Sequence, residues 1–211
     1  MKSGKLDPIK TLKLLKKHYP DAHCALDYSN PFQLLIATIL SAQCTDERVN
    51  IVTKTLFKKY KKPSDLAEEN IEEIESVIRS AGFYKNKARN IKSCCEILKI
   101  QYNNKIPQTM EELVDLPGVG RKTANVVLGN AFGLASGVVV DTHVTRLTNR
   151  FGWVNVQDAV KIEQKLNKMF PPEEWVMLSH YLISHGRAIC KARSPLCEAC
   201  FLSSDCPRKG V

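Results

Sequence analysis

Apolar residues recur every three or four positions along most of this 211-residue chain. One clear example places Ala88, Ile91, Cys95 and Leu98 on the same face of a helix. The run Val138–Val140 is the one segment with strand character, and three residues are too few to build a sheet. The pattern therefore predicts an all-α fold.

The expected helices have recognisable starts. Asp7-Pro8 and Asn30-Pro31 each combine an N-cap residue with proline at the first helical position. Capping boxes are expected over residues 70–73 and 109–112, where Asn or Thr is followed three positions later by Glu. The second Asx-Pro pair precedes a segment that is apolar almost all round, which predicts a fully buried helix. The buried face of the first helix is expected to contain Ile9, Leu12 and Leu15.

Charge and hydropathy restrict the class of protein. The formal net charge is +9, which favours a polyanionic partner. The longest apolar stretch, Phe32–Ala42, is too short to cross a bilayer, and the N-terminus does not resemble a signal peptide. We therefore expect no membrane association and a reducing compartment, where cysteines serve as metal ligands or core residues and not as disulfides. The basic run Arg79–Lys105 holds seven bases and one acid, and is expected to be a solvated helix face.

Four of the eight cysteines are concentrated near the C-terminus, with the spacing C-x6-C-x2-C-x5-C. Four thiolates within 17 residues can surround one metal centre. Zinc sites usually contain two C-x2-C pairs, and only one pair is present here, so a [4Fe–4S] cluster fits better than zinc or four unrelated cysteines. The predicted ligands are Cys190, Cys197, Cys200 and Cys206. The remaining cysteines are expected to be core or surface thiols: Cys24, Cys44, Cys94 and Cys95.

A glycine-containing turn is expected between two helices in the segment Leu116–Ala124. Gly118 and Gly120 permit positive φ angles and close approach of another backbone. The second helix would begin beside them, with unpaired N–H groups and a positive dipole end that suit a phosphate. A plain turn between two helices is the alternative interpretation.

An acidic residue follows the apolar run Val138–Val140. Asp141 is well suited to be the N-cap of the next helix, and a carboxylate at the end of a buried segment can also be catalytic. His143, two residues later, could contact an anion or lie on the surface.

These features together resemble the endonuclease III family of DNA repair glycosylases, whose helix-hairpin-helix, aspartate-bearing segment and iron–sulfur spacing occur here in order. The resemblance covers the chain from about Pro31 to Cys206. The matching segments are Leu116–Ala124, Val140–His143, Cys190–Cys206, Ser41–Asp46 and Gly82–Ala88.

The resemblance implies two α-helical lobes with a DNA-binding cleft between them. Residues 25–133 would form a helical barrel that contains the helix-hairpin-helix. Residues 1–24 and 134–211 would form the domain with the [4Fe–4S] cluster. The partner would be double-stranded DNA with damaged bases or abasic sites, bound by a monomer in the cytoplasm, associated with the nucleoid in a prokaryote.

The resemblance also implies a bifunctional enzyme that excises oxidised pyrimidines and cleaves the abasic site by β-elimination. Lys122 would be the nucleophile that forms a Schiff base, and Asp141 would be its catalytic partner. The positive end of the helix and burial are both expected to favour the reactive, neutral amine of Lys122.

Further residues would contact DNA. Gln43 would fill the gap that a displaced base leaves, and Phe83 falls where relatives have a bulky, often aliphatic, wedge. Ser194 occupies a position where the family often has another lysine, which predicts a weaker contribution from the cluster loop. The phosphate contacts would come from Gly118, Gly120, Arg121, His143, Lys191 and Arg193.

Three alternatives remain. A monofunctional mismatch or adenine glycosylase of the same superfamily commonly lacks the lysine at position 122. A non-catalytic helix-hairpin-helix protein would need neither this lysine nor the cluster. A small iron–sulfur electron carrier does not explain the hairpin.

Overall fold

The computed structural model describes residues 4–211, and these residues form helices and loops without any β-strand. The all-α prediction is therefore confirmed, and Val138–Val140 is not part of a β-strand. None of the described helices is long and apolar enough to span a membrane. In chain order the α-helices are α1 (Pro8–His18), α2 (Pro31–Leu40), α3 (Asp46–Lys59), α4 (Pro63–Glu68), α5 (Ile71–Ile78), α6 (Tyr84–Tyr102), α7 (Met110–Val114), α8 (Arg121–Phe132), α9 (Thr142–Arg150), α10 (Ala159–Met169) and α11 (Trp175–Ala188). The short 3-10 helices are η1 (Arg79–Ala81), η2 (Pro172–Glu174) and η3 (Cys197–Ala199).

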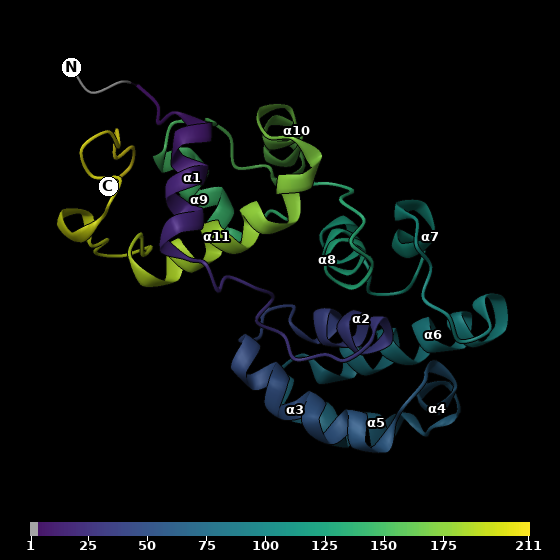
Figure 1. Cartoon of the computed structure of the whole chain (residues 1–211). Coiled ribbons are helices and arrows are strands. Elements are labelled where there is room, and N and C mark those ends of the chain that lie inside the picture. Colours follow the sequence, from purple (N-terminus) through teal and green to yellow (C-terminus); the bar gives the residue numbers. More distant parts are fainter. Residues whose placement is uncertain (1–3) are drawn as a thin grey trace. The chain divides into compact units, whose positions relative to one another are not determined.

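The chain divides into two compact units. The central unit is Cys24–Leu134 and contains α2 to α8 (Figure 1). The terminal unit joins the described residues up to His23 with Ala135–Val211, and so combines α1 with α9, α10 and α11.

The central unit is built around α2. Asn30 caps this helix, because its side chain accepts a hydrogen bond from the Gln33 backbone at 3.0 Å. Phe32 and every residue of Leu34–Leu40 are buried, and α2 packs against α3, α6 and α8. The predicted buried helix and its start are therefore confirmed.

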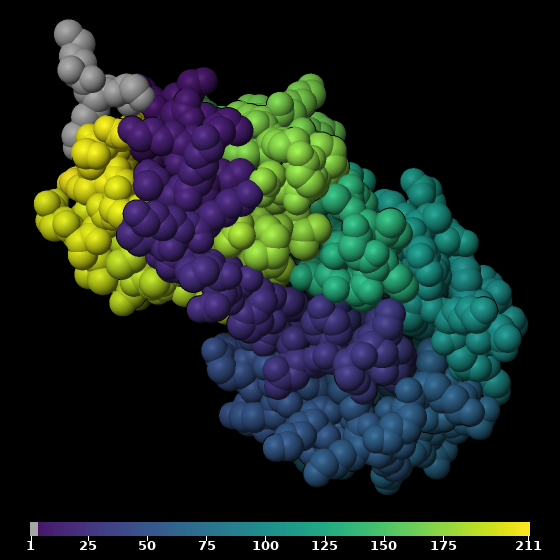
Figure 2. Space-filling model, viewed as in Figure 1, coloured from purple at the N-terminus to yellow at the C-terminus, as the bar shows by residue number. Residues whose placement is uncertain are grey.

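The terminal unit packs α1 against α11 and α11 against α9. The C-terminal segment lies along α1, as the yellow and purple surfaces in Figure 2 show. Lys10 pairs with Asp205 at 2.9 Å, and the rings of His18 and Phe201 stack with their centroids 3.8 Å apart. The prediction for the buried face of α1 was wrong at Ile9, which is exposed.

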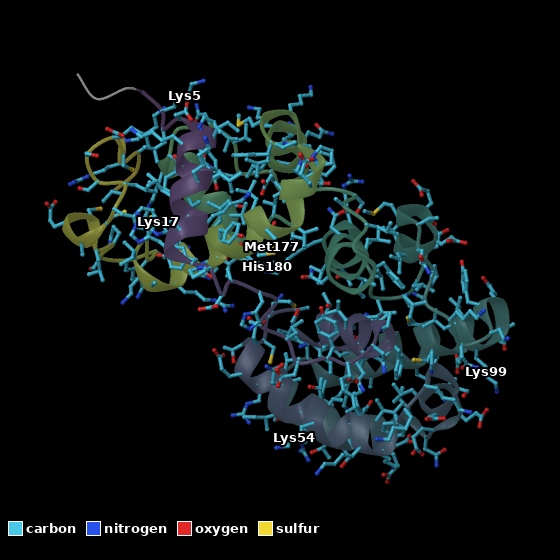
Figure 3. The ribbon with its side chains drawn as sticks, viewed as in Figure 1. Lys5, Lys17, Lys54, Lys99, Met177 and His180 are labelled. Atoms are coloured by element: carbon cyan, nitrogen blue, oxygen red, sulfur yellow. The ribbon has the colours of Figure 1, made fainter. Side chains whose placement is uncertain are left out.

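Five of the seven bases in the run Arg79–Lys105 are exposed, as predicted for a solvated helix face, but two lysines of α6 are not. Lys87 is buried and donates to two backbone carbonyls, and Lys92 does the same elsewhere on the helix. Lys99, labelled in Figure 3, pairs with Glu68 of α4 at 2.8 Å. Several of these charges therefore stabilise the central unit itself.

One further local prediction was wrong, and one helix was not predicted. Asn70 does precede α5, but its side chain makes no cap hydrogen bond, so the first capping box is absent. Thr109 does cap α7 by accepting from the Glu112 backbone at 3.3 Å. The six-residue helix α4 was not expected, because a segment this short contains too few apolar positions to show a period.

Candidate active site and iron–sulfur site

The turn between α7 and α8 contains two glycines, which differ in their backbone conformation and in the space around them. Gly118 has a φ of +79°, and a Cβ at this position would lie 2.9 Å from the Cβ of Asn90. Gly120 has an ordinary φ of −95° and caps α8, and a Cβ there would meet nothing within 4 Å. Gly118 is therefore required by the fold, whereas an added methyl at Gly120 would point into open space.

Lys122 is the second residue of α8, after the N-cap Gly120 and the first helical residue Arg121. The backbone N–H groups of this first turn have no carbonyl partners within the helix and carry a partial positive charge. The lysine side chain is exposed, so the expectation that it would be buried was wrong. An exposed amine at this position can reach a molecule bound outside the unit.

Asp141 ends the buried segment Val138–Val140 and begins α9. Its Oδ1 accepts a hydrogen bond from the Val144 backbone at 2.8 Å, which confirms the predicted N-cap. The Val138 backbone is itself held by the Asn167 side chain at 3.1 Å. The carboxylate is half-buried, and its position is set by both the helix and the anchored segment.

His143 packs where α9 meets α11. A Cβ on Gly186 would lie 2.7 Å from the Nδ1 of His143, so only glycine allows this close approach. The Arg146 guanidinium, which can only donate, lies 3.1 Å from the same nitrogen. The Nδ1 of His143 therefore acts as the acceptor of this hydrogen bond.

Gln43 and Phe83 share an unusual backbone conformation. Their φ angles are +52° and +47°, in the left-handed region that non-glycine residues rarely adopt. Both side chains are exposed, and that of Phe83 is 66% accessible. Strained, exposed residues of this kind are typical of functional sites. The sequence motif indicated both positions, but their shared conformation was not predicted.

The four C-terminal cysteines line one pocket of the terminal unit. The Cys190 Sγ accepts from Arg150 at 3.4 Å, and the Cys200 Sγ accepts from the Leu202 backbone at 3.4 Å. Burial raises the pKa of the Cys200 thiol, so a bound metal centre must displace a proton there. Among residues 4–211, no three His, Cys, Asp or Glu side chains form a site of single-ion size. Four sulfur donors around an apolar pocket, with N–H groups directed at two of them, fit an iron–sulfur cluster.

The loop between the first two of these cysteines is held by two arginines of α9. Arg146 donates to the Cys190 carbonyl at 3.0 Å, and the buried Arg150 donates to the carbonyls of Lys191 and Ala192 at 2.7 and 3.0 Å. The side chains of Lys191 and Arg193 are exposed. Sequence reasoning missed both α9 arginines, although their i, i+4 spacing places them on one helix face.

The remaining cysteines agree with the sequence prediction. Cys94 and Cys95 are fully buried, and burial raises the pKa of Cys94 to about 12. Cys24 and Cys44 are half-buried free thiols.

Comparisons with known proteins decide the family. Residues 36–172 match the model of the HhH-GPD superfamily base excision DNA repair proteins. Residues 190–206 match the iron–sulfur binding domain of endonuclease III. Endonuclease III of Synechocystis sp. is 52% identical over 98% of this chain and 94% of its own length. The chain belongs to the endonuclease III family.

Other relatives in this family lead to the same conclusion. Endonuclease III of Escherichia coli K12 is 40% identical over 98% of this chain and 97% of its own. A solved non-covalent endonuclease III–DNA complex is 49% identical and covers 95% of this chain and 94% of its own, with a TM-score of 0.90. A trapped endonuclease III–DNA covalent intermediate has the same identity, coverage and TM-score.

Membership of the endonuclease III family gives the enzyme class and the cofactor. The protein is a base-excision repair enzyme, a DNA glycosylase and abasic-site lyase, and it carries a [4Fe–4S] cluster. The family resemblance and the predicted cofactor are thus confirmed, and zinc is not the metal of this domain.

We expect the purified protein to be brown and to contain about four irons per chain, because four thiolates hold a cubane cluster. The segment after α11 has one regular element, the three-residue η3, so the cluster should hold the loop together. Cys200→Ser should lower both the iron content and the melting temperature. Iron analysis and thermal unfolding measure these effects, and a colourless protein with one zinc per chain would contradict the ligand assignment.

Proposed function

We propose that this enzyme removes oxidised pyrimidines from duplex DNA and cleaves the resulting abasic site through a Schiff base on Lys122. The supporting observation is the exposed amine of Lys122 in the first turn of α8, two residues after Gly120. A phosphate bound by the N–H groups of this turn would bring a DNA backbone to the lysine. The monofunctional relatives considered above commonly lack a lysine at this position.

The proposed reaction begins at the C1′ carbon of the damaged nucleotide. The N-glycosidic bond breaks, the base leaves with the bonding electrons and takes up a proton, and the neutral amine of Lys122 bonds to C1′. The C1′–O4′ bond then breaks and O4′ takes up a proton, which opens the sugar ring and gives the Schiff base. This iminium makes the C2′ proton acidic, so that its removal expels the 3′ phosphate by β-elimination. Hydrolysis then releases the lysine.

Asp141 is proposed to be the carboxylate of this reaction. It can balance the positive charge that develops on the sugar as the base leaves, and it can accept the proton that the lysine loses. The cap bond to Val144 and the anchored Val138 keep this carboxylate at one place in its unit. Such fixed charges stabilise a transition state without having to reorganise.

The remaining predicted residues are proposed to bind DNA phosphates. Gly120 and Arg121 would contribute from the start of α8, and Gly118 would keep the turn in the required conformation. Lys191 and Arg193 would contribute from the cysteine loop, whose shape the cluster and Arg150 maintain. His143, in the first turn of α9, is proposed to make one more phosphate contact. The cluster itself would shape this loop and supply no redox step for base removal.

Gln43 and Phe83 are proposed to occupy the space that a base leaves when it is extracted from the duplex. Extraction costs a few kcal/mol of stacking, which side chains inserted into the gap can offset. Their exposure and their left-handed backbone are the supporting observations. We further infer that the partner is double-stranded DNA, that the protein acts as a monomer, and that it works in the cytoplasm as bacterial DNA repair requires.

A panel of duplexes, each with one defined lesion, tests the proposed substrate. Thymine glycol, other saturated or fragmented pyrimidines and a preformed abasic site should each be processed, with base release and strand cleavage scored separately. A duplex with a mispaired adenine and a duplex with undamaged thymine serve as controls. Release of mismatched adenine without strand cleavage would support the monofunctional alternative.

The two hairpin glycines give a matched pair of variants. Gly118→Ala should destabilise the protein by about 1–3 kcal/mol, because the left-handed φ disfavours any side chain and Asn90 must shift. Gly120→Ala should fold with nearly normal stability but should bind DNA more weakly, since its methyl would occupy the space proposed for a phosphate. Thermal melting and binding to an abasic-site analogue measure both effects. Normal DNA affinity of Gly120→Ala would argue against a phosphate at the hairpin.

A further inference from the structure

Lys87 of α6 is a buried lysine whose ammonium lies between the ends of two other elements. Its Nζ donates to the Leu40 carbonyl at 2.7 Å and to the Ala81 carbonyl at 2.8 Å. Leu40 is the last residue of α2, and Ala81 is the last residue of η1. The backbone N–H of Lys87 also donates to the Phe83 carbonyl at 3.1 Å. One residue therefore holds both sides of the turn at Gly82.

Burial of a charged lysine at this position costs free energy, because the ammonium loses its hydration. Its exposed fraction is 5%, and burial lowers the pKa of Lys87, partly opposed by the nearby Cys44 thiol. A buried ammonium must recover its lost hydration through its hydrogen bonds. Carbonyls at the C-terminal end of a helix lack helical partners and carry partial negative charge, so Leu40 is a suitable acceptor. A hydrophobic residue would fill the same volume but could not satisfy these two carbonyls.

The carbonyls of Leu40 and Ala81 lie shortly before the two proposed gap-filling residues in the chain. Gln43 follows Leu40 by three positions, and Phe83 follows Ala81 by two. Both have left-handed φ angles, which cost about 1–3 kcal/mol each and persist only where the surroundings enforce them. Since α2 packs directly against α6 (Figure 1), a link at this point can set the distance between the two segments.

We propose that Lys87 is a positioning residue for base extraction, which holds the segments of Gln43 and Phe83 at one fixed spacing. This proposal rests on the gap-filling roles assigned to those two residues above. Lys87 is buried and acts through them, by keeping both side chains ready to enter the gap without an ordering step.

Lys92 provides a matched control on the same helix. Its Nζ also donates to two backbone carbonyls, those of Ala67 at 2.7 Å and Glu69 at 2.8 Å, at the end of α4. Lys92→Met therefore removes the same kind of link from α6, at carbonyls that lie 14 or more positions from both Gln43 and Phe83. The comparison separates general destabilisation from loss of positioning.

The kinetic test measures base release in single turnover at saturating enzyme, on the best substrate of the lesion panel. We expect Lys87→Met to slow base release by about 10- to 100-fold, since a small displacement of positioning groups has effects of this size. Lys92→Met should stay within about twofold of the wild type. Borohydride trapping on a preformed abasic site should fall much less than base release in Lys87→Met, because extraction of an intact base is no longer required there.

A variant cycle asks whether Lys87 acts through the two side chains. In a background of Gln43→Ala and Phe83→Ala, the added Lys87→Met should slow base release by less than about threefold. Both gap-filling side chains are already absent there, so Lys87 has no side chain to position. Amide hydrogen exchange of the free protein should become faster over residues 41–45 and 82–85 in Lys87→Met and remain unchanged there in Lys92→Met. If Lys87→Met does not fold, Lys87→Gln replaces it, since its side chain ends one bond short of the ammonium position and its amide can be hydrated.

The outcomes are distinguishable. Equal effects of Lys87→Met and Lys92→Met, fully additive losses in the cycle, or unchanged exchange over both segments would overturn the positioning role. Failure of the wild type to release any pyrimidine lesion would instead contradict the proposed substrate, and hydrogen exchange would still decide whether Lys87 holds the two segments.

Discussion

Lys122→Gln should not form a covalent complex with abasic DNA when borohydride is present, and strand cleavage should fall to background. A Schiff base requires a primary amine, and the glutamine amide cannot replace it. Peptide mapping of the wild-type adduct should place the reduced DNA fragment on Lys122. Binding to an abasic-site analogue should change by less than about tenfold, because one charge is lost among many retained contacts.

Arg121→Gln is the matched control for this result. It removes the same charge one residue earlier in α8, where the side chain is also exposed. It should weaken binding and lower the salt dependence by about one unit of slope, yet it should still give a trapped complex. An adduct that maps to another lysine, or normal strand cleavage by Lys122→Gln, would refute the nucleophile assignment.

Asp141→Asn should keep the fold and lose base excision. Asparagine is as good an N-cap as aspartate, so the hydrogen bond to Val144 and the start of α9 should persist. The amide cannot accept a proton or balance positive charge on the sugar, so base release should slow by about 10²- to 10⁴-fold. Single-turnover base release and thermal melting measure the two properties separately.

A preformed abasic site gives a second measurement on the same variant. There the glycosidic bond is already broken, so strand cleavage by Asp141→Asn should be reduced less than base release. Asp158→Asn is a suitable control, because Asp158 caps α10 through the Lys161 backbone at 2.8 Å and has no proposed role in the reaction. Near-normal base release by Asp141→Asn would show that this carboxylate serves only as a helix cap.

Features that depend on a few neighbouring residues could be predicted from the sequence. The start of α2 at Pro31 and the cap at Asp141 are local hydrogen-bonding arrangements, and both are present. Features that depend on packing could not be predicted in the same way. Ile9 has the right helical spacing for the buried face of α1 but is exposed, because spacing alone does not show how far the neighbouring elements extend.

The motifs of the site were likewise visible in the sequence, whereas their surroundings were not. The cysteine spacing predicted the cluster domain, since four closely spaced thiolates have a specific chemistry. Lys122 was indicated by the resemblance of the hairpin segment to the endonuclease III family. The exposure of Lys122 was predicted wrongly, because the burial of a helix start depends on which segments cover it. The arginines that hold the cysteine loop come from α9, more than 40 positions earlier in the chain.

The sequence by itself determined the all-helical architecture, the caps of α2 and α9, and the order of the hairpin, aspartate and cysteine motifs. These follow from hydrophobic period and short-range hydrogen bonding, which act within a few residues. Only the tertiary structure decided that Lys87 is buried and joins the segments of Gln43 and Phe83, although the composition of α6 predicted a solvated basic face. The physical reason is that a lysine is buried only where distant backbone carbonyls converge to replace its water, and the sequence of one helix does not contain that information.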